Sequence, residues 1–284
     1  MDIITTNEKK IIIRNCDNFN ISKTLECGQC FRWDRNLDGS YTGIIENTVI
    51  NIMQNQESTV EIKFISGGYS KEFIIYYFDL KRDYEKINTS IADLEFIGDS
   101  YRYSKGIRIL KQSPWEILIS FIISQNNNIK RIKGIINNLC RKFGKRIIDE
   151  YYSFPSLNEL SNISIKDLES LKCGFRDKYI IDAIEKINNK IIVLEDIYDV
   201  DTESARQILK LINGVGDKVA DCILLYGFSK TDCFPTDIWI KRTLEKFFPE
   251  NLPNVNKNYL GIIQQYMFYY VRSNSYFFFN KKKK

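Results

Sequence analysis

Residues 212–227 read INGVGDKVADCILLYG, and this stretch decides how the C-terminal half of the chain folds. Gly214 and Gly216 indicate a tight turn, after which an apolar helical pattern begins with Lys218 in its first turn. Because the first N–H groups of a helix carry partial positive charge, we expect the pKa of Lys218 to be lowered. A lysine that deprotonates more easily is a better amine nucleophile.

The glycine turn alone has two interpretations. Its spacing is typical of a helix–turn–helix corner in which glycine is needed for packing. The amides that open the second helix also point outward, where they can bind an anion such as phosphate. On glycine spacing alone, the packing interpretation is favoured.

A carboxylate follows the turn. Residues 234–242 read FPTDIWIKR, so Asp237 lies 19 positions after Lys218 (237 minus 218). Its place just before an apolar helical pattern predicts an N-cap. Because a capping carboxylate is held rigidly, it could also stabilise positive charge that develops on a substrate beside a lysine amine.

Composition excludes several kinds of chemistry. The chain has 284 residues, 44% hydrophobic and 13% aromatic, with a net charge of +5 (41 minus 36) and no histidine. The lack of histidine removes the usual general base, the commonest zinc ligand and any Ser–His or Cys–His pair. The mild charge means that an anionic partner must be held by local patches.

The cellular setting is also constrained. Seven cysteines, an odd number, are scattered along the chain, and residues 1–7 lack a signal pattern, so we expect a reducing, intracellular compartment. We therefore expect a cytoplasmic, nucleoid-associated protein if the source is prokaryotic and a nuclear one if it is eukaryotic. No apolar run approaches the roughly 20 residues that span a bilayer, so no membrane association is expected.

The hydrophobic patterns predict an α+β fold. Residues 9–66 alternate or are β-branched and predict an antiparallel sheet of hairpins, with a turn at residues 36–40. From about residue 69, apolar residues recur at helical spacing. The predicted helical segments are 70–78, 84–94, 115–123, 129–143, 158–160, 165–171, 178–188, 202–211, 217–227, 238–248 and 260–271.

Two domains are expected: a β-rich N-terminal domain with flanking helices at residues 1–112, and a helical domain with a helix–hairpin–helix motif at residues 113–284. Pro114, Ser156 and Ser164 suit helix starts, and Gly227 suits a helix end. Lysines 281–284 are expected to form a solvated tail.

The motifs resemble those of a known enzyme family. The sequence GVGDKVADC at residues 214–222, followed by PTD at 235–237, is similar to the helix–hairpin–helix DNA glycosylases with a Gly/Pro-rich loop and an aspartate. Eukaryotic-type 8-oxoguanine DNA glycosylase/lyases are the closer resemblance, and it covers nearly all of the chain except the first few residues and the tail. Further matching segments are GQCFRW (28–33), SQNNNIKRI (124–132), FPSL (154–157), GFR (174–176) and QQYMF (264–268).

This resemblance implies a mechanism. Lys218 would attack C1′ of the damaged nucleotide, displace the base and form a Schiff base that permits β-elimination. Asp237 would stabilise the cationic sugar and help to position the backbone.

The resemblance also implies a pocket for the damaged base. Gly28 would accept a hydrogen bond from the N7–H group that 8-oxoguanine has and guanine lacks, whereas by itself it is equally typical of a strand bulge or hairpin. Cys222 and Phe268 would sandwich the extruded base, and Gln264 would hydrogen-bond its Watson–Crick edge. By pattern alone, Cys222 and Phe268 are ordinary core residues.

Three residues match positions that contact the cytosine opposite the lesion: Asn126, Arg131 and Arg176. Planar amide and guanidinium groups suit an unpaired base edge, although solvated helix polarity is the usual explanation of a single arginine. The run of three asparagines marks a turn or a cap.

Two positions depart from the family pattern. Phe175 stands where a tyrosine wedge is usual, and its aromatic face suffices for stacking. Trp239 stands where the eukaryotic enzymes have a histidine that contacts phosphate, and tryptophan donates only one neutral hydrogen bond. With Gly214 and Gly216, these residues complete the predicted DNA-binding set.

The expected partner is double-stranded DNA containing an oxidised purine, and a monomer is the default expectation. No cofactor or metal is expected, although the hairpin backbone could bind a monovalent or divalent cation. An iron–sulfur cluster is not expected either, because no four-cysteine cluster follows the hairpin.

Other interpretations remain open. Cys27 and Cys30 form a C-x-x-C pair, but the following residues predict a strand rather than the helix of a redox motif. A second cysteine pair or a histidine suitable for zinc is absent from the sequence. A non-enzymatic helix–hairpin–helix DNA-binding protein is a stronger alternative, which the pairing of Lys218 with Asp237 disfavours. A glycosylase for alkylated bases or oxidised pyrimidines is the last alternative.

Overall fold

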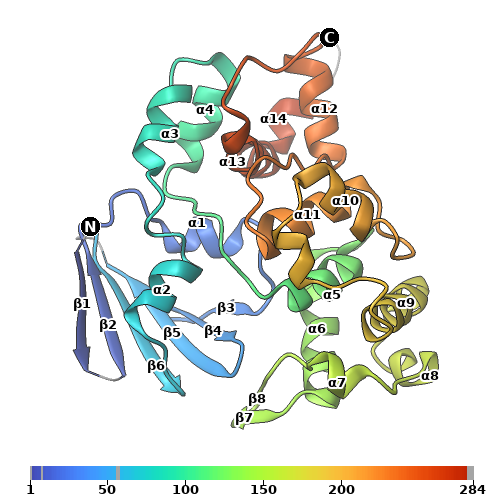
Figure 1. Ribbon diagram of the computed structural model, residues 1–284. Helices are drawn as coiled ribbons and strands as arrows, with labels where there is room; N and C mark the ends of the chain where they lie inside the picture. The colour runs from blue at the N-terminus through green and yellow to red at the C-terminus, as the bar shows by residue number, and fades with distance from the viewer. Residues whose placement is uncertain (1, 8, 56–57, 280–284) are drawn as a thin grey trace.

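The N-terminal part of the chain is an antiparallel sheet (Figure 1). The computed structural model describes residues 2–7, 9–55 and 58–279, so the predicted lysine tail lies outside the described residues. The six strands of this sheet follow the order β1-β2-β6-β5-β4-β3. The strands are β1 (Asp2–Asn7), β2 (Lys10–Arg14), β3 (Trp33–Arg35), β4 (Tyr41–Ile45), β5 (Thr48–Gln54) and β6 (Val60–Ser66).

The strands form where the sequence alternates. In β6, Val60, Ile62 and Phe64 are buried while the residues between them are more exposed, as expected for a sheet with one face on a core. The predicted turn at residues 36–40 joins β3 to β4, and the Asn36 N–H donates to the Ser40 carbonyl over 2.8 Å. The hairpin sheet predicted from the sequence is therefore confirmed.

Helices make up most of the remainder, which confirms the α+β class (Figure 1). They are α2 (Lys71–Tyr77), α3 (Tyr84–Ile91), α4 (Glu95–Ser104), α5 (Pro114–Ser124), α6 (Ile129–Phe143), α7 (Leu157–Leu160), α8 (Ile165–Glu169), α9 (Asp177–Asn188), α10 (Thr202–Leu209), α11 (Asp217–Gly227), α12 (Ile238–Phe247), α13 (Leu260–Ser273) and α14 (Ser275–Phe279), with short 3₁₀ turns at Gly174–Arg176, Glu195–Tyr198 and Lys257–Tyr259.

The predicted helix boundaries agree with the structure. Pro114 is the first residue of α5, and α11 ends at Gly227. Ser156 and Ser164 each cap a helix within a capping box. Local capping chemistry therefore sets these helix ends, as the sequence indicated.

Several elements differ from the predictions, and the longest of them is helix α4 (Glu95–Ser104), which none of the predicted helical segments covers. A helix, α1 (Ile21–Glu26), lies inside the region predicted as strands, and strand β3 begins only at Trp33. The predicted all-helical remainder also holds a small hairpin, β7 (Arg146–Ile148) with β8 (Tyr151–Tyr152). The side chain of Asn20 caps α1 by accepting from the Lys23 N–H over 2.8 Å. One and a half turns are too short for a helical period to stand out.

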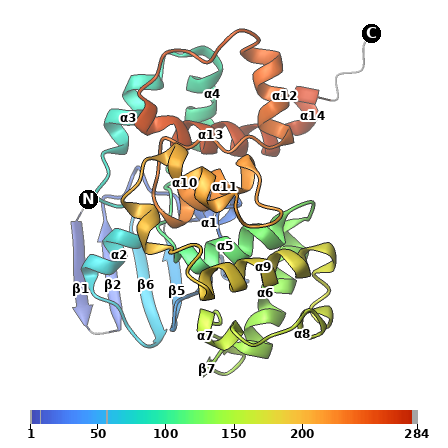
Figure 2. The same cartoon turned by 45° about the vertical axis from the view of Figure 1, so that its right-hand side comes forward.

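Two hydrophobic cores organise the molecule. One joins the sheet to α2 and part of α1, and the other fills the helical part. Helices α3 and α4 precede residue 113 but pack in the helical core beside α13 (Figures 1 and 2). There Phe96 stacks on Phe247 with ring centroids 4.1 Å apart. The boundary after residue 112 stays a prediction.

The membrane expectation concerns helix length and polarity. Within residues 2–7, 9–55 and 58–279, every helix is too short or too polar to cross a bilayer.

Candidate active site

The glycine turn joins α10 to α11 and has two different faces. Gly214 has a φ of +80°, and a Cβ there would overlap the ring of Tyr179. Gly216 is the N-cap of α11, and a Cβ there would meet open space. The carboxylate of Asp182 fixes the turn by accepting from the backbone N–H of Asn213 over 2.7 Å. Gly214 is thus needed for packing, while Gly216 leaves the start of α11 accessible.

A cavity of about 60 Å³ lies beside the start of α11. Every residue predicted to be catalytic or to bind the damaged base lines it. The lining consists of Gly28, Phe121, Lys218, Cys222, Tyr226, Pro235, Asp237, Gln264 and Phe268. The pocket is therefore assembled from the loop after α1, helices α5, α11 and α13, and the start of α12.

Lys218 is partly buried, with Nζ 5.5 Å from the ring centroid of Phe121. One turn further along α11, burial raises the pKa of the Cys222 thiol to about 11, and the positive charge and hydrogen bond of Lys218 oppose that rise. Among the described residues, Lys218 has no carboxylate within ion-pair distance. The amine therefore lies between a ring and a neutral thiol, without a fixed counter-ion.

Asp237 caps α12, as predicted. Its Oδ1 accepts from the Ile240 N–H over 2.9 Å. Burial raises the pKa of Asp237, while the backbone hydrogen bond and the charges of Lys218 and Arg272 oppose that rise. The cap holds the carboxylate at the pocket, and burial makes its ionised form costly.

Gln264 presents an unused acceptor. Its Nε2 donates to the Pro235 carbonyl over 2.8 Å, whereas its buried Oε1 has no hydrogen-bond partner in the described part of the chain. Leaving a buried acceptor unpaired costs about 1–3 kcal/mol. The pocket is therefore incomplete without a donor from elsewhere.

Gly28 lies where the sheet region meets the helical region. Its φ of +89° strains any residue with a side chain, and a Cβ there would lie 3.6 Å from Cε1 of Phe268. Gln265 ties this loop to α13 by donating to the Cys27 carbonyl over 3.2 Å, and it accepts from the Tyr226 hydroxyl over 2.5 Å.

The residues predicted to contact the opposite base lie outside the pocket lining: Asn126 on the loop before α6, Arg131 in the first turn of α6, and Arg176 in the 3₁₀ turn before α9. Asn126 is exposed with a φ of +46°, and Asn128 caps α6 by accepting from the Arg131 N–H over 3.0 Å. The asparagine run is thus a turn followed by a cap. Arg131 is exposed and donates to the Lys172 carbonyl over 3.2 Å.

Arg176 differs from its neighbours because it is buried. Its guanidinium donates to the carbonyls of Gln125, Asn126 (3.1 Å) and Cys173 (2.9 Å). It therefore holds the two loops together. The ring of Phe175, 48% exposed, lies with its centroid 4.4 Å from the guanidinium carbon of Arg176.

Trp239 lies in the first turn of α12. It is partly buried and packs against the helical core. It follows the cap residue Asp237 by two positions, and its phosphate contact stays a prediction.

Four residues at or beside the pocket were not predicted: Phe121, Tyr226, Pro235 and Arg272. The first three are ordinary apolar or aromatic residues of the core, and Arg272 lies in the last turn of α13. No local sequence signal separates a ring that lines a pocket from a ring that fills a core.

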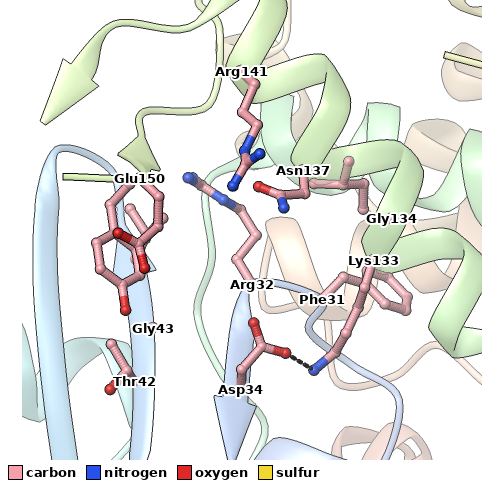
Figure 3. Close-up of a pocket in the computed structure, with 13 residues that line it drawn as sticks. Phe31, Arg32, Asp34, Thr42, Gly43, Lys133, Gly134, Asn137, Arg141 and Glu150 are labelled. Carbon is pink, nitrogen blue, oxygen red and sulfur yellow. Dashed lines mark hydrogen bonds and ion pairs between the residues drawn. The ribbon is translucent and has the colours of Figure 1, made fainter. Parts of the chain in front are cut away.

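A larger cleft of about 370 Å³ separates β3 and β4 from α6 and the β7–β8 hairpin (Figure 3). It holds none of the predicted site residues. Its buried cation, Arg32, pairs with Glu116 over 3.4 Å, and Lys133 pairs with Asp34 over 3.0 Å. Because two of its cations already have partners, this cleft is a weaker candidate site than the pocket at Lys218.

The alternative chemistries are disfavoured by burial. Cys27 and Cys30 are buried free thiols, and burial raises the pKa of Cys27 to about 12. Thiolate chemistry needs the opposite shift. Within the described residues, no group of three or more Cys, Asp or Glu side chains could hold a metal ion.

The fold and this pocket define a helix–hairpin–helix DNA glycosylase. Residues 119–255 match the family described as "HhH-GPD superfamily base excision DNA repair protein", and residues 11–118 match "8-oxoguanine DNA glycosylase, N-terminal domain". The chain belongs to the family of 8-oxoguanine DNA glycosylases and N-glycosylase/DNA lyases.

Individual relatives agree with this assignment. The N-glycosylase/DNA lyase of Saccharomyces cerevisiae is 34% identical over 270 residues, which are 84% of this chain and 70% of the yeast protein. A probable N-glycosylase/DNA lyase of Methanothermobacter thermautotrophicus is 35% identical over 204 residues, 63% of this chain and 64% of that protein. The 8-oxoguanine glycosylase/lyase of Clostridium acetobutylicum, solved with duplex DNA containing cytosine opposite 8-oxoguanine, superposes with a TM-score of 0.88 at 36% identity, covering 96% of this chain and 99% of that one.

Proposed function

We propose that this protein extrudes 8-oxoguanine from duplex DNA, excises it, and cleaves the strand at the resulting site through Lys218. It is a DNA N-glycosylase and DNA-(apurinic or apyrimidinic site) lyase. The observation that carries the proposal is the single pocket in which Lys218, Asp237, Cys222, Gln264, Phe268 and Gly28 meet.

The amine chemistry needs a neutral nucleophile and a nearby anion. The unprotonated Nζ of Lys218 attacks C1′, and the C1′–N9 bond breaks with its electron pair leaving on the base. The base takes up a proton as it departs, and the sugar ring opens to give a Schiff base between Nζ and C1′. Loss of a C2′ proton then expels the 3′ phosphate by β-elimination. The carboxylate of Asp237 stabilises the positive charge that develops on the sugar.

The pocket supplies what an oxidised purine requires. The unpaired Oε1 of Gln264 suits a donor on the Watson–Crick edge, such as N1–H. The Gly28 carbonyl suits N7–H, and the ring of Phe268 with the thiol of Cys222 suits the two faces of the base. At about 60 Å³ the cavity holds only a few waters. Because Phe268 is partly exposed, its ring is the one we expect to move when a base enters.

We further propose a preference for cytosine opposite the lesion. Asn126 and Arg131 support it as exposed amide and guanidinium groups, which suit an unpaired base edge. Phe175, also exposed, has the aromatic face that a wedge in the vacated stack needs.

Other features of the protein are proposals of the same kind. The reaction requires no cofactor, and the backbone of the glycine turn could bind a monovalent or divalent cation. We propose a monomer without membrane association, in the compartment that holds the cell's DNA.

Borohydride trapping tests the enzymatic proposal. Duplexes with 8-oxoguanine opposite each of the four bases are incubated with wild type, Lys218→Ala and the exposed-lysine control Lys166→Ala. We expect a covalent adduct with wild type and the control, strongest opposite cytosine, and none with Lys218→Ala. Binding without base release or adduct in wild type would instead support a non-enzymatic DNA-binding protein, and equal rates against all four bases would remove the cytosine preference.

A further inference from the structure

Arg272 is a cation beside the pocket to which the sequence motifs assign no role. It lies in α13 one turn after Phe268, so the two side chains share a face of the helix. Its Nη1 would lie 3.5 Å from a Cβ placed on Gly28, and its guanidinium carbon lies 5.9 Å from the ring centroid of Phe268. Arg272 thus contacts the loop and the ring proposed to hold the base.

The guanidinium is exposed, and among the described residues it has no hydrogen bond and no ion pair. Its charge still reaches the pocket, where it opposes the rise in the pKa of Asp237. Arg108 and Arg176, which are buried, and Arg206, which is partly buried, differ because each donates to carbonyls or carboxylates of the protein. A guanidinium has five N–H donors and no acceptor. Those of Arg272 are available to a ligand.

The position in the helix explains only part of this arrangement. A cation in the last turn of a helix is stabilised by the helix dipole. This stabilisation would also be present if the side chain pointed into solvent in another direction. It gives no reason for Nη1 to lie beside Gly28, the residue proposed to read the oxidised edge of the base.

We propose that Arg272 is a specificity-determining residue that donates a hydrogen bond to O8 of 8-oxoguanine. The inference rests on the proposed function. In this base, O8 is bonded to C8, next to N7, so a donor beside Gly28 faces O8 while the Gly28 carbonyl accepts from N7–H. Undamaged guanine has C8–H at that position and offers no acceptor there. Arg272 and Gly28 together then read both atoms that oxidation changes.

Binding measurements with two duplexes test this contact. Dissociation constants are measured for 8-oxoguanine opposite cytosine and for a reduced abasic site opposite cytosine, with Arg272→Ala, Arg272→Lys and the exposed-arginine control Arg102→Ala. We expect Arg272→Ala to weaken binding of the 8-oxoguanine duplex about tenfold and to leave the abasic duplex nearly unchanged. Arg272→Lys should recover part of the loss, because lysine keeps a charged donor without the planar fork.

Several outcomes would overturn the proposal. An equal loss on both duplexes, with a shallower dependence of affinity on salt, would show a phosphate contact instead. An unchanged affinity for the 8-oxoguanine duplex would show a solvated side chain. Unfolding temperatures of the variants exclude a folding defect as the cause of a loss. A third duplex, with guanine opposite cytosine, is measured with wild type alone. If wild type does not bind the 8-oxoguanine duplex more tightly than the guanine duplex, the proposed function fails too, and that result is distinguishable because it needs no variant.

Discussion

The lesion pocket and the opposite-base loops both contain polar and charged side chains, but the two regions differ in how far the protein itself supplies partners for them. In the pocket, neither an ion-pair partner for Lys218 nor a hydrogen-bond donor to Oε1 of Gln264 is found among the residues that the structure describes. Among the predicted opposite-base residues, Arg176 uses its guanidinium on three backbone carbonyls, whereas Asn126 and Arg131 are exposed. Polar groups whose hydrogen bonds or ion pairs are not satisfied within the protein are therefore the ones that we expect to bind a ligand. Polar groups whose hydrogen bonds are satisfied support the backbone.

Removal of the pocket amine should have the largest effect. We expect Lys218→Ala to lower the single-turnover rate of 8-oxoguanine release by about 10⁴-fold or more, because no second amine in the described part of the chain lines the pocket to replace the nucleophile. The measurement is strand cleavage after alkali, which reports base release independently of lyase activity. Retention of more than a tenth of the wild-type rate would contradict the role of Lys218.

Asp237→Asn should have the next largest effect, about 10²- to 10³-fold on base release, because an amide cannot stabilise a developing cation as a carboxylate does. DNA binding should persist, since Asn is also a good N-cap. Equal turnover of Asp237→Asn and wild type would remove the catalytic role of Asp237.

The pKa of Asp237 gives this variant a second signature. Burial raises the folded-state pKa above the unfolded value, so ionisation as pH rises between the two lowers the free energy of unfolding. The neutral amide avoids that loss, and Asp237→Asn should be at least as stable as wild type at pH 7. The ordinary pKa of aspartate is about 3.9. Because the pKa of Asp237 is raised, wild-type activity should fall on acidification at a pH above that value. A lower unfolding temperature of Asp237→Asn than of wild type at pH 7 would contradict this account.

The sequence predicted the catalytic residues better than the other residues that line the pocket. The glycine turn, the cap at Asp237 and the helix periods are local patterns, so they could be read without tertiary contacts. The roles of Gln264, Cys222 and Phe268 required the family resemblance, and the patterns of Cys222 and Phe268 are those of ordinary core residues. The helix α1 was missed because six residues carry too little periodicity. Tyr226 became visible only when folding placed it beside the pocket.

Base readout should be separable from the amine chemistry. We expect Gln264→Ala to slow 8-oxoguanine release by about 10- to 100-fold, as a lost hydrogen bond in a buried site implies. Cleavage of a preformed abasic site should stay near the wild-type rate, because that substrate has no base to read. An equal loss on both substrates would mean that Gln264 acts by shaping the pocket.

The opposite-base loops should show the smallest effects on release, and there the comparison of exposed with buried groups can be tested directly. Asn126→Ala should reduce the preference for cytosine about tenfold, as expected for the loss of one base contact, with only a small drop in unfolding temperature because its φ of +46° is less favourable for alanine than for asparagine. Arg176→Ala should instead lower the free energy of unfolding by about 2 kcal/mol, because the carbonyls of Gln125, Asn126 and Cys173 lose the buried guanidinium as their donor. Thermal unfolding, and release rates against each opposite base, measure the two effects separately. If Arg176→Ala changed only the base preference and left stability intact, the hydrogen bonds to Gln125, Asn126 and Cys173 would be dispensable. The hydrogen bonds that a side chain makes within the protein would then not tell whether it supports the backbone or contacts a base.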